Sequence, residues 1–232
     1  MTDARDPSSG IRLTRAHDRR LRAMYRSAGW PCLDGIEIEL LGHGLLERVT
    51  DGRGSEYLRV TDAGIARLAQ SLNQNRQAFD AHEALVDRVA REMAGQGRIA
   101  WRGLTLLGKP DDAWQHLKPD VFSIRNTTVE DYVEPLVHEI KVRRADLLCD
   151  LRKPEKRAGY RALASGCYYV LAEGIGTAED IPPECGVMIA TPTQILVIRP
   201  APRRAIRLAF HQWMALTKAQ RIHADDRLEP ML

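Results

Sequence analysis

The amino-acid sequence predicts a mixed α/β (α+β) fold in two parts, a small helical part with one hairpin and a larger part built on a mixed sheet. Two observations support this. In the first part, helical periodicities precede the turn signal "DGRG", which lies between two short β-type runs. From about residue 75, a helix, three apolar strand runs, a helical region and further strand runs follow one another.

Composition favours a globular chain with a substantial core, because 44% of the 232 residues are hydrophobic. No run of about 18 apolar residues predicts a membrane span, and the first ten residues lack the apolar stretch of a secretory signal. We therefore expect no membrane partner and a cytoplasmic, nucleoid-associated protein. We expect residues 1–11 to be disordered.

The four cysteines predict no zinc site. They are scattered, without a Cys-x-x-Cys pair or a histidine at metal-ligand spacing. We expect reduced and mostly buried thiols.

The first part spans residues 12–74. Thr14 can cap a helix that contains Leu21 and Met24, and Gly29 and Pro31 can end it. A short helix at about 34–43, a hairpin, and a helix opened by Thr61-Asp62 complete this part. The order resembles a winged-helix domain, most clearly in "HGLLERVTDGRGSEYLRVTDAG".

That resemblance implies DNA reading by the short helix, yet its charges argue against such a role. Asp34, Glu37 and Glu39 lie in it without a Lys or Arg, and carboxylates repel phosphates. The hairpin is the better DNA-contact candidate, with Arg53 at its tip and Arg48 and Arg59 beside it. Pairing of two copies into a homodimer, or docking of another partner through this domain, is equally open.

The second part spans residues 75–232. Its first helix is expected at about 76–95, and Pro154 either kinks the helical region 144–165 or starts a second helix within it. The last helix is expected at about 204–222. The strand candidates are "RIAWRGLTLLG", "DVFSI", "PLVHEIKV", "CYYVLAEG", "CGVMIAT" and "QILVIRP".

Acidic and basic side chains in two of these strands form the candidate for chemistry. Alternation places Glu139 and Lys141 on one strand face and His138 on the other, so His138 is expected to be a core histidine. If "DVFSI" pairs with this strand, Asp120 faces Glu139, and two such carboxylates need a positive partner. Mg²⁺ meets that need, and Lys141 could help deprotonate an attacking water. A structural salt bridge between Glu139 and Lys141 is the alternative.

Pro119-Asp120, a loop, and Glu139-Ile140-Lys141 resemble the motif of the PD-(D/E)XK superfamily of restriction-endonuclease-like nucleases. Residues 76–205 are similar to MmcB-like DNA-repair proteins within it. The resemblance implies a restriction-endonuclease-like αβββαβ core that binds Mg²⁺ or Mn²⁺. It implies Asp120, Glu139 and the Ile140 carbonyl as metal ligands, with Lys141 as the catalytic lysine. Enzymes of this superfamily often use a further glutamate from the first helix. Glu83 fits that role, because it borders the apolar stripe of the expected helix.

A basic segment after the candidate site predicts contact with a phosphate backbone. Between residues 141 and 161 eight basic side chains stand against three acidic ones, although a solvated helix face is an equal alternative. The predicted DNA-binding residues, including the hairpin tip, are Arg143, Arg144, Lys153, Lys156, Tyr160 and Arg53.

The sequence thus predicts a metal-dependent DNA endonuclease that acts in repair, defence or a mobile element. The alternatives are a catalytically inactive DNA-binding or regulatory protein on the same fold, and an assembly subunit that pairs through its winged helix.

Overall fold

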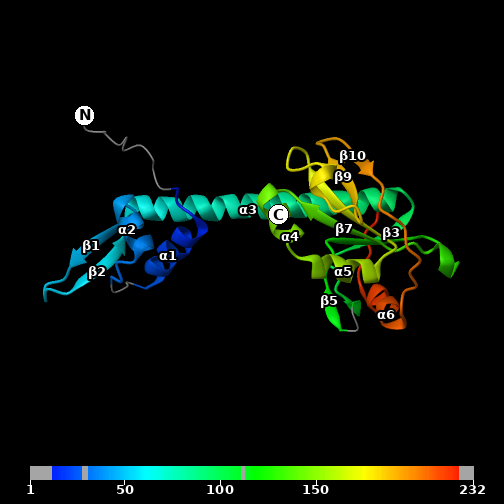
Figure 1. The fold of residues 1–232 in the computed structure, drawn as a ribbon, viewed down its shortest axis with the longest axis horizontal. Helices are drawn as coiled ribbons and strands as arrows, with labels where there is room; N and C mark the ends of the chain where they lie inside the picture. Colours follow the sequence, from blue (N-terminus) through cyan, green and yellow to red (C-terminus); the bar gives the residue numbers. More distant parts are fainter. Residues whose placement is uncertain (1–11, 28–30, 111–112, 225–232) are drawn as a thin grey trace, which may run out of the picture. The chain divides into compact units, whose positions relative to one another are not determined.

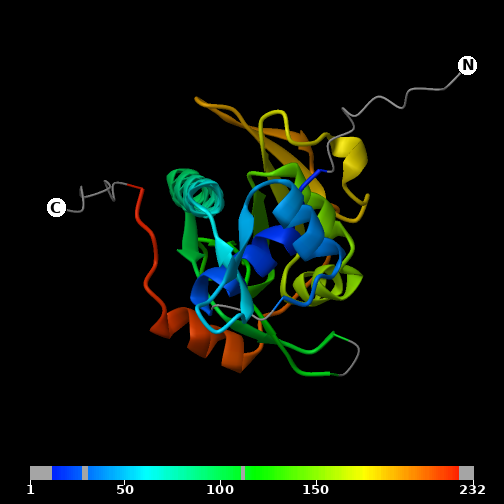
Figure 2. The same ribbon diagram turned by 90° about the vertical axis from the view of Figure 1, so that its left-hand side faces the viewer.

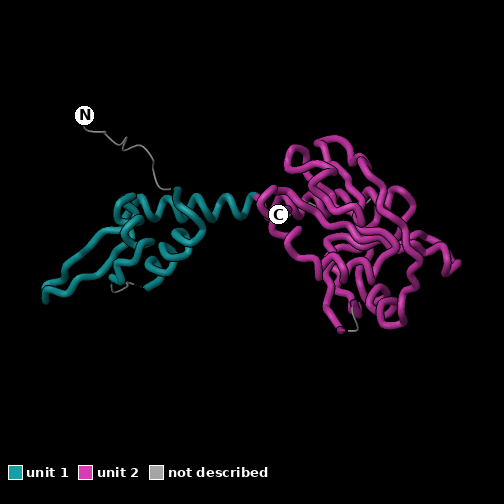
Figure 3. The backbone as a smooth tube through the Cα atoms, viewed as in Figure 1, with its two compact units in different colours: residues 1–77 teal, residues 78–232 magenta. Residues whose placement is uncertain are grey.

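The structure, a computed structural model, describes residues 12–27, 31–110 and 113–224. The chain divides into two compact units, Met1–Gln77 and Ala78–Leu232 (Figure 3). The division lies three residues after the boundary expected between 74 and 75. The predicted disordered segment 1–11 and the predicted helix stop at Gly29 lie outside the described residues.

Unit 1 contains a helix, a short helix and a hairpin, followed by the first turns of a long helix (Figure 1). The Thr14 side chain caps the first helix, as expected from its sequence position. Leucines from every element form the core of this unit, where Leu21, Leu40 and Leu58 are fully buried. The elements are α1 (Arg15–Arg26), α2 (Gly35–Gly42), β1 (Leu46–Thr50), β2 (Glu56–Val60) and α3 (Asp62–Gly95).

Helix α3 corrects one expectation. Two separate helices were expected, one opened by Thr61-Asp62 and one at about 76–95, but α3 runs without a break through the polar segment "SLNQNRQAFD" between them. The segment contains neither Gly nor Pro, and Gln, Arg and Ala are good helix formers. Its polar composition therefore reflects exposure to solvent, since residues 72–77 are all exposed.

Unit 2 is built on a six-stranded mixed sheet of order β10-β9-β8-β7-β6-β3. Strands β3, β6 and β7 pair antiparallel, β7, β8 and β9 pair parallel, and β10 returns antiparallel to β9. The strands are β3 (Arg98–Arg102), β6 (Val121–Arg125), β7 (Leu136–Lys141), β8 (Gly166–Ala172), β9 (Gly186–Ala190) and β10 (Ile195–Arg199).

Helices cover both faces of this sheet. On one face, Val86 and Val89 of α3, which is seen nearly end-on in Figure 2, pack in one core with Ile140 and Val170. On the other face, a larger core includes residues of the remaining helices, such as Leu147, Tyr160 and Leu216. These helices are α4 (Arg144–Leu151), α5 (Pro154–Leu163) and α6 (Phe210–Lys218).

Three local features differ from expectation or decide between alternatives. The run expected as one strand from Arg98 to Gly108 is β3 followed by β4 (Leu106–Gly108), which forms a separate hairpin with β5 (Gln115–Leu117). Pro154 starts the new helix α5 at its first position. The last helix, α6, is shorter than expected, and among the described residues no helix is both long and apolar enough to cross a membrane.

Candidate active site at the ends of β6 and β7

The pairing of β6 with β7 places the predicted carboxylates opposite each other. Val121 pairs with His138 and Phe122 with Val137, so the next position of this antiparallel register sets Asp120 against Glu139. The two residues are joined through the backbone as well, because the N–H of Ile140 donates to Asp120 Oδ2 over 2.8 Å. Asp120 therefore lies directly before the start of β6, beside the Glu-x-Lys segment of β7.

Glu139 and Lys141 belong to a network of four charged side chains. Lys141 Nζ and Lys156 Nζ both donate to Glu139 Oε1 over 2.5 Å. Lys156 Nζ also donates to Asp150 Oδ1 over 2.7 Å, and Lys141 Nζ lies 3.6 Å from the same oxygen. Two carboxylates thus balance two ammonium groups, and Glu139, Lys141 and Asp150 are all buried.

Glu139 is only half satisfied by this network. Its residue is 4% exposed, yet the described residues supply no hydrogen-bond partner for the buried Oε2. Leaving a buried carboxylate oxygen without a donor costs free energy, so native proteins rarely do it. This oxygen is accordingly the position at the site where a further positive ligand fits best.

Burial and charge shift the pKa values of this network in opposite directions. Burial alone would raise the pKa of Asp150, but Lys141 and Lys156 lower it below its ordinary value. Burial lowers the pKa of Lys156, but Glu139 and Asp150 raise it by more, so that the net shift of this pKa is upward. Asp150 and Lys156 are therefore held in their charged forms over the neutral pH range.

Asp120 has a histidine neighbour that the sequence interpretation did not include. His82 on α3 places Nε2 3.5 Å from Asp120 Oδ2 and Nδ1 3.2 Å from Glu83 Oε1. Burial raises the pKa of Asp120, but the contacts of His82 and the Ile140 N–H outweigh it and lower that pKa. The contact with Asp120 raises the pKa of His82 in turn.

Glu83 lies at the same hollow as Asp120. The hollow has a volume of about 290 Å³, and both carboxylates line it together with Lys118 and Arg102. However, no three His, Cys, Asp or Glu side chains within the described ranges form a group that could hold a metal ion. The predicted set of Glu83, Asp120 and Glu139 is thus not gathered into one cluster, because Glu139 turns towards the lysines and Glu83 towards His82.

The fourth predicted ligand was the main-chain carbonyl of Ile140. The side chain of Ile140 is fully buried in the core beneath α3, and its N–H is the group that contacts Asp120. The role of its carbonyl stays a prediction.

Two tyrosines close the network from the core side. Tyr169 donates its hydroxyl to Asp150 Oδ2 over 2.8 Å, and Tyr160 donates to the carbonyl of Lys118 over 2.9 Å. Burial, together with Asp150 for Tyr169 and Glu139 for Tyr160, raises the pKa of both phenols. Both hydroxyls therefore stay protonated and serve as donors.

The structure separates the predicted DNA-binding residues into groups. Lys156 and Tyr160 belong to the site itself, and the Lys156 ammonium lies 5.4 Å from the centre of the Tyr160 ring. Arg144 is exposed but pairs with Asp180 through both guanidinium nitrogens at 2.9 and 3.0 Å.

The three other predicted DNA-binding residues lie on loops and helix starts. Arg143 is half-buried at the residue before α4, and Lys153 is exposed at the residue before α5. Arg53 is exposed at the tip of the β1–β2 hairpin. Contact of these side chains with DNA stays a prediction.

Sequence reasoning missed two members of the site, His82 and Asp150. Asp150 follows the buried Leu147 by three residues, so both lie on the helix face that meets the core. That spacing was the available signal for Asp150. His82 immediately precedes Glu83, and only the placement of α3 against β6 brings it to Asp120.

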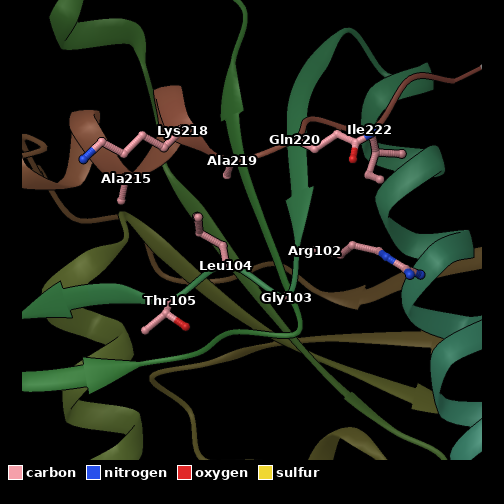
Figure 4. A pocket seen from close by; sticks show the side chains of 9 residues that line it. All are labelled: Arg102, Gly103, Leu104, Thr105, Ala215, Lys218, Ala219, Gln220 and Ile222. Carbon is pink, nitrogen blue, oxygen red and sulfur yellow. The ribbon is translucent and has the colours of Figure 1, made fainter.

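A second hollow, of about 500 Å³, shares Arg102 and Gly103 with the first (Figure 4). The basic ends of Arg102 and Lys218 point to opposite sides of it, as Figure 4 shows. Arg102 is moreover engaged by Asp87 on α3. Because its basic groups do not converge and no carboxylate lines it, this hollow is not a candidate active site.

Among known proteins, the chain has a structural neighbour of low sequence identity. No protein-family model matches it, and no curated protein matches it. A solved structure with some similarity is the SPO1766 protein of unknown function from Silicibacter pomeroyi. That chain is 21% identical, with a TM-score of 0.41, and the match covers 56% of this chain and 77% of the other.

Proposed function

We propose that unit 2 hydrolyses phosphodiester bonds in DNA with the help of Mg²⁺ or Mn²⁺, as an endonuclease of the PD-(D/E)XK type. The observation that carries this proposal is the buried Oε2 of Glu139, opposite Asp120, for which the described residues supply no hydrogen-bond donor. The order of α3, β3, β6, β7, α4, α5 and β8 also supports it, since it resembles the αβββαβ pattern expected of that core, with the β4–β5 hairpin inserted after β3 and two helices after β7.

Asp120 and the second oxygen of Glu139 are oxygen ligands of the kind that a hard divalent cation takes, although the three predicted carboxylates do not form one cluster among the described residues. Mg²⁺ takes oxygen ligands, commonly one or two carboxylates, and keeps water in its remaining positions. Asp120 and Glu139 would hold it, with Glu83 at the same hollow as Asp120. When bound, such an ion stabilises negative charge on a phosphate and lowers the pKa of a bound water.

The side chains of the chain itself have distinct tasks in this proposal. Lys141 brings an ammonium group to the carboxylates, where it orients the attacking water and offsets negative charge that develops on the phosphate. Lys156 holds Glu139 Oε1, and Asp150 holds Lys156, so that the other oxygen of Glu139 keeps its direction. Tyr169 fixes Asp150 from the core.

One observation favours a second candidate, a DNA-binding protein without catalysis. Both lysines are neutralised by Glu139 and Asp150, so the network is balanced without any ligand. A buried ion network of this kind can serve packing alone. The two candidates differ in whether cleavage occurs and requires a metal.

Cleavage assays on plasmid, duplex, nicked and branched DNA test the proposal. The wild-type chain is expected to cut with Mg²⁺ or Mn²⁺ and not with EDTA. Asp120→Asn, Glu139→Gln and Lys141→Ala are each expected to lower the rate by about a hundredfold or more, because each removes charge at the reacting group.

The matched control is Glu134→Gln. Glu134 pairs with Arg125 and Arg203 instead of the site lysines, so this variant is expected to cut like the wild type. Metal-dependent cleavage that survives in both Asp120→Asn and Lys141→Ala would refute the proposal. Failure of the folded wild type to cut any of the substrates would favour the non-catalytic candidate.

A further inference from the structure

Helix α1 carries a line of four arginines. Arg15, Arg19, Arg22 and Arg26 follow one another at spacings of four, three and four residues, so they lie on one face of the helix. Arg15, Arg19 and Arg26 are exposed, and Arg22 is half-buried. We call these four residues the arginine face.

The opposite side of α1 fixes the direction of this face. His17 and Leu21 are buried, and Met24 packs against the same core of unit 1. The apolar side of α1 is therefore occupied within the unit and is not available for insertion into a lipid surface. Only charged groups are presented to solvent along the arginine face.

The other charges of α1 are already paired. Asp18, the acidic residue of this helix, accepts from Arg67 Nε over 2.7 Å. Arg20 donates to Asp34 and Glu37, over 2.5 and 2.7 Å. In the ranges that the structure describes, none of the four arginines of the face forms an ion pair.

Four guanidinium groups on one face repel each other and destabilise the isolated helix. A dense line of negative charge would remove this repulsion. Arg15 and Arg26 are eleven residues apart, or about 16 Å along the helix axis. Duplex DNA carries about one charge per 1.7 Å of its axis, so a stretch of this length presents several phosphates.

The rest of unit 1 offers weaker candidates for DNA contact. Helix α2, in the position expected to read DNA, carries no basic side chain. Two hairpin arginines are paired with carboxylates, Arg48 with Glu56 and Arg59 with Glu47. Arg53 is exposed at the hairpin tip, but the longest line of arginines in the described part of unit 1 lies on α1.

We infer that the arginine face of α1 binds the phosphate backbone of duplex DNA, through charge and without reading the base sequence. Guanidinium groups are suited to this because they form paired, charge-assisted bonds with phosphate oxygens. The choice of DNA among polyanions rests on the proposed function. The binding itself is independent of cleavage.

Binding of the full chain to a fluorescently labelled 20-base-pair duplex in EDTA tests the inference. The variant R15Q/R19Q/R22Q/R26Q is expected to bind at least tenfold more weakly than the wild type near 100 mM salt. The slope of log affinity against log salt should fall by about 3 to 4, since each phosphate contact contributes about 0.9.

Two further variants control this experiment. The fourfold Arg→Lys variant keeps the charge and should keep the salt slope, and R48Q/R53Q/R59Q in the hairpin should change it less than the α1 variant. Far-UV circular dichroism and melting show that each variant is folded. An unchanged slope in the α1 variant, or a larger loss in the hairpin variant, would overturn the inference.

Phosphatidylserine vesicles provide the competing polyanion. Wild-type binding to these vesicles that is as tight as binding to DNA, and that is lost in the α1 variant, would overturn the choice of DNA. Cleavage is measured separately with Mg²⁺. Absence of cleavage would refute the proposed function and leave the α1 result standing, whereas an unchanged salt slope would refute only the role of α1.

Discussion

Each unit of this protein buries one glutamate in a charged network, and the two glutamates differ in how they are satisfied. In unit 1, Glu37 is fully buried, and Arg20 donates to its Oε1. The backbone N–H groups of Cys32 and Leu33 donate to its Oε2 over 2.8 and 2.7 Å. In unit 2, Glu139 has two lysines on Oε1 and, among the described residues, no donor to Oε2.

This difference in hydrogen bonding distinguishes a buried carboxylate with a structural role from one that has an oxygen available to a ligand. Both oxygens of Glu37 are used to hold α2 and the preceding chain against α1, so neither oxygen is left without a donor. Glu139 holds its lysines with one oxygen and leaves the other in a buried position. Burial and charge are alike in the two cases, and only the account of individual hydrogen bonds separates them.

The largest expected effect comes from removing the Glu37 carboxylate, both oxygens of which accept hydrogen bonds. Glu37→Ala leaves Arg20 without its buried partner and two N–H groups without an acceptor, so we expect a loss of about 3–5 kcal/mol in the free energy of unfolding of unit 1. Urea unfolding followed by circular dichroism measures it. Glu56→Ala, which removes an exposed partner of Arg48, is the control. A loss below 1 kcal/mol for Glu37→Ala would contradict the comparison.

The next largest effect concerns stabilisation by a metal ion at Oε2 of Glu139, the oxygen without a donor among the described residues. Mn²⁺ at a hundred times its dissociation constant should stabilise the wild type by about 2.7 kcal/mol, since a ligand that binds only the folded state adds this much. Glu139→Gln should abolish this stabilisation, and Glu134→Gln should retain it. Thermal melting with and without Mn²⁺ measures the change. Equal stabilisation of Glu139→Gln and the wild type would show that Oε2 is not reserved for a cation.

His138 sharpens the comparison, because it is the neighbour of Glu139 on the opposite strand face and also lacks hydrogen-bond partners in the described chain. The ring is fully buried and stacks on Tyr168 at 5.6 Å. Burial lowers the pKa of His138 to about 3, with Arg98 as a further cause. This group avoids the cost of a buried, unpaired charge by staying neutral.

The stability contribution of His138 therefore depends on pH. The unfolded chain binds a proton at this histidine below about pH 6.5, whereas the native chain does so only near pH 3. Stability should fall as pH drops through this window, by about 1.4 kcal/mol per pH unit. Unfolding at pH 7 and pH 5 should show a smaller drop for His138→Leu than for the wild type. The exposed His116 provides the control, and an equal drop in His138→Leu would contradict this account.

The smallest effect is expected at the surface. Arg59 pairs with Glu47 across the hairpin at 2.7 Å, with both side chains largely exposed. Arg59→Gln should change the free energy of unfolding by less than about 1 kcal/mol, because solvent and salt screen such pairs. Urea unfolding in low and high salt checks this. A loss as large as that of Glu37→Ala would remove the distinction between buried and exposed pairs.

Much of the site geometry could be predicted because it depends on local pattern. Strand alternation placed Glu139 and Lys141 on one face and His138 on the other, and the observed register of β6 with β7 sets Asp120 opposite Glu139. The hairpin turn in unit 1 was likewise readable from its glycines, of which Gly54 adopts a positive φ of 81°. Patterns of period two and short turns determine these features.

Features that depend on tertiary packing were missed. Asp150 joins the site because α4 and α5 pack against the sheet, and His82 does so because α3 lies across β6. The β4–β5 hairpin was also missed, and it depends on a close approach to α5, where Gly159 leaves room for Leu117. The arginine face of α1 was missed although its spacing was in the sequence.

The two edge strands of the six-stranded sheet, β3 and β10, differ in what lies beside them. At the β3 edge, the N–H of Ile222 donates to the carbonyl of Ala100 over 2.8 Å and forms an isolated antiparallel β-bridge with this strand. Next to β10, the described residues place no further strand, and Leu196, Val197 and Ile198 are exposed. The β10 edge is therefore the one at which, in the described chain, a further strand could pair along several residues. The single bridge at Ala100 covers the β3 edge at one residue only.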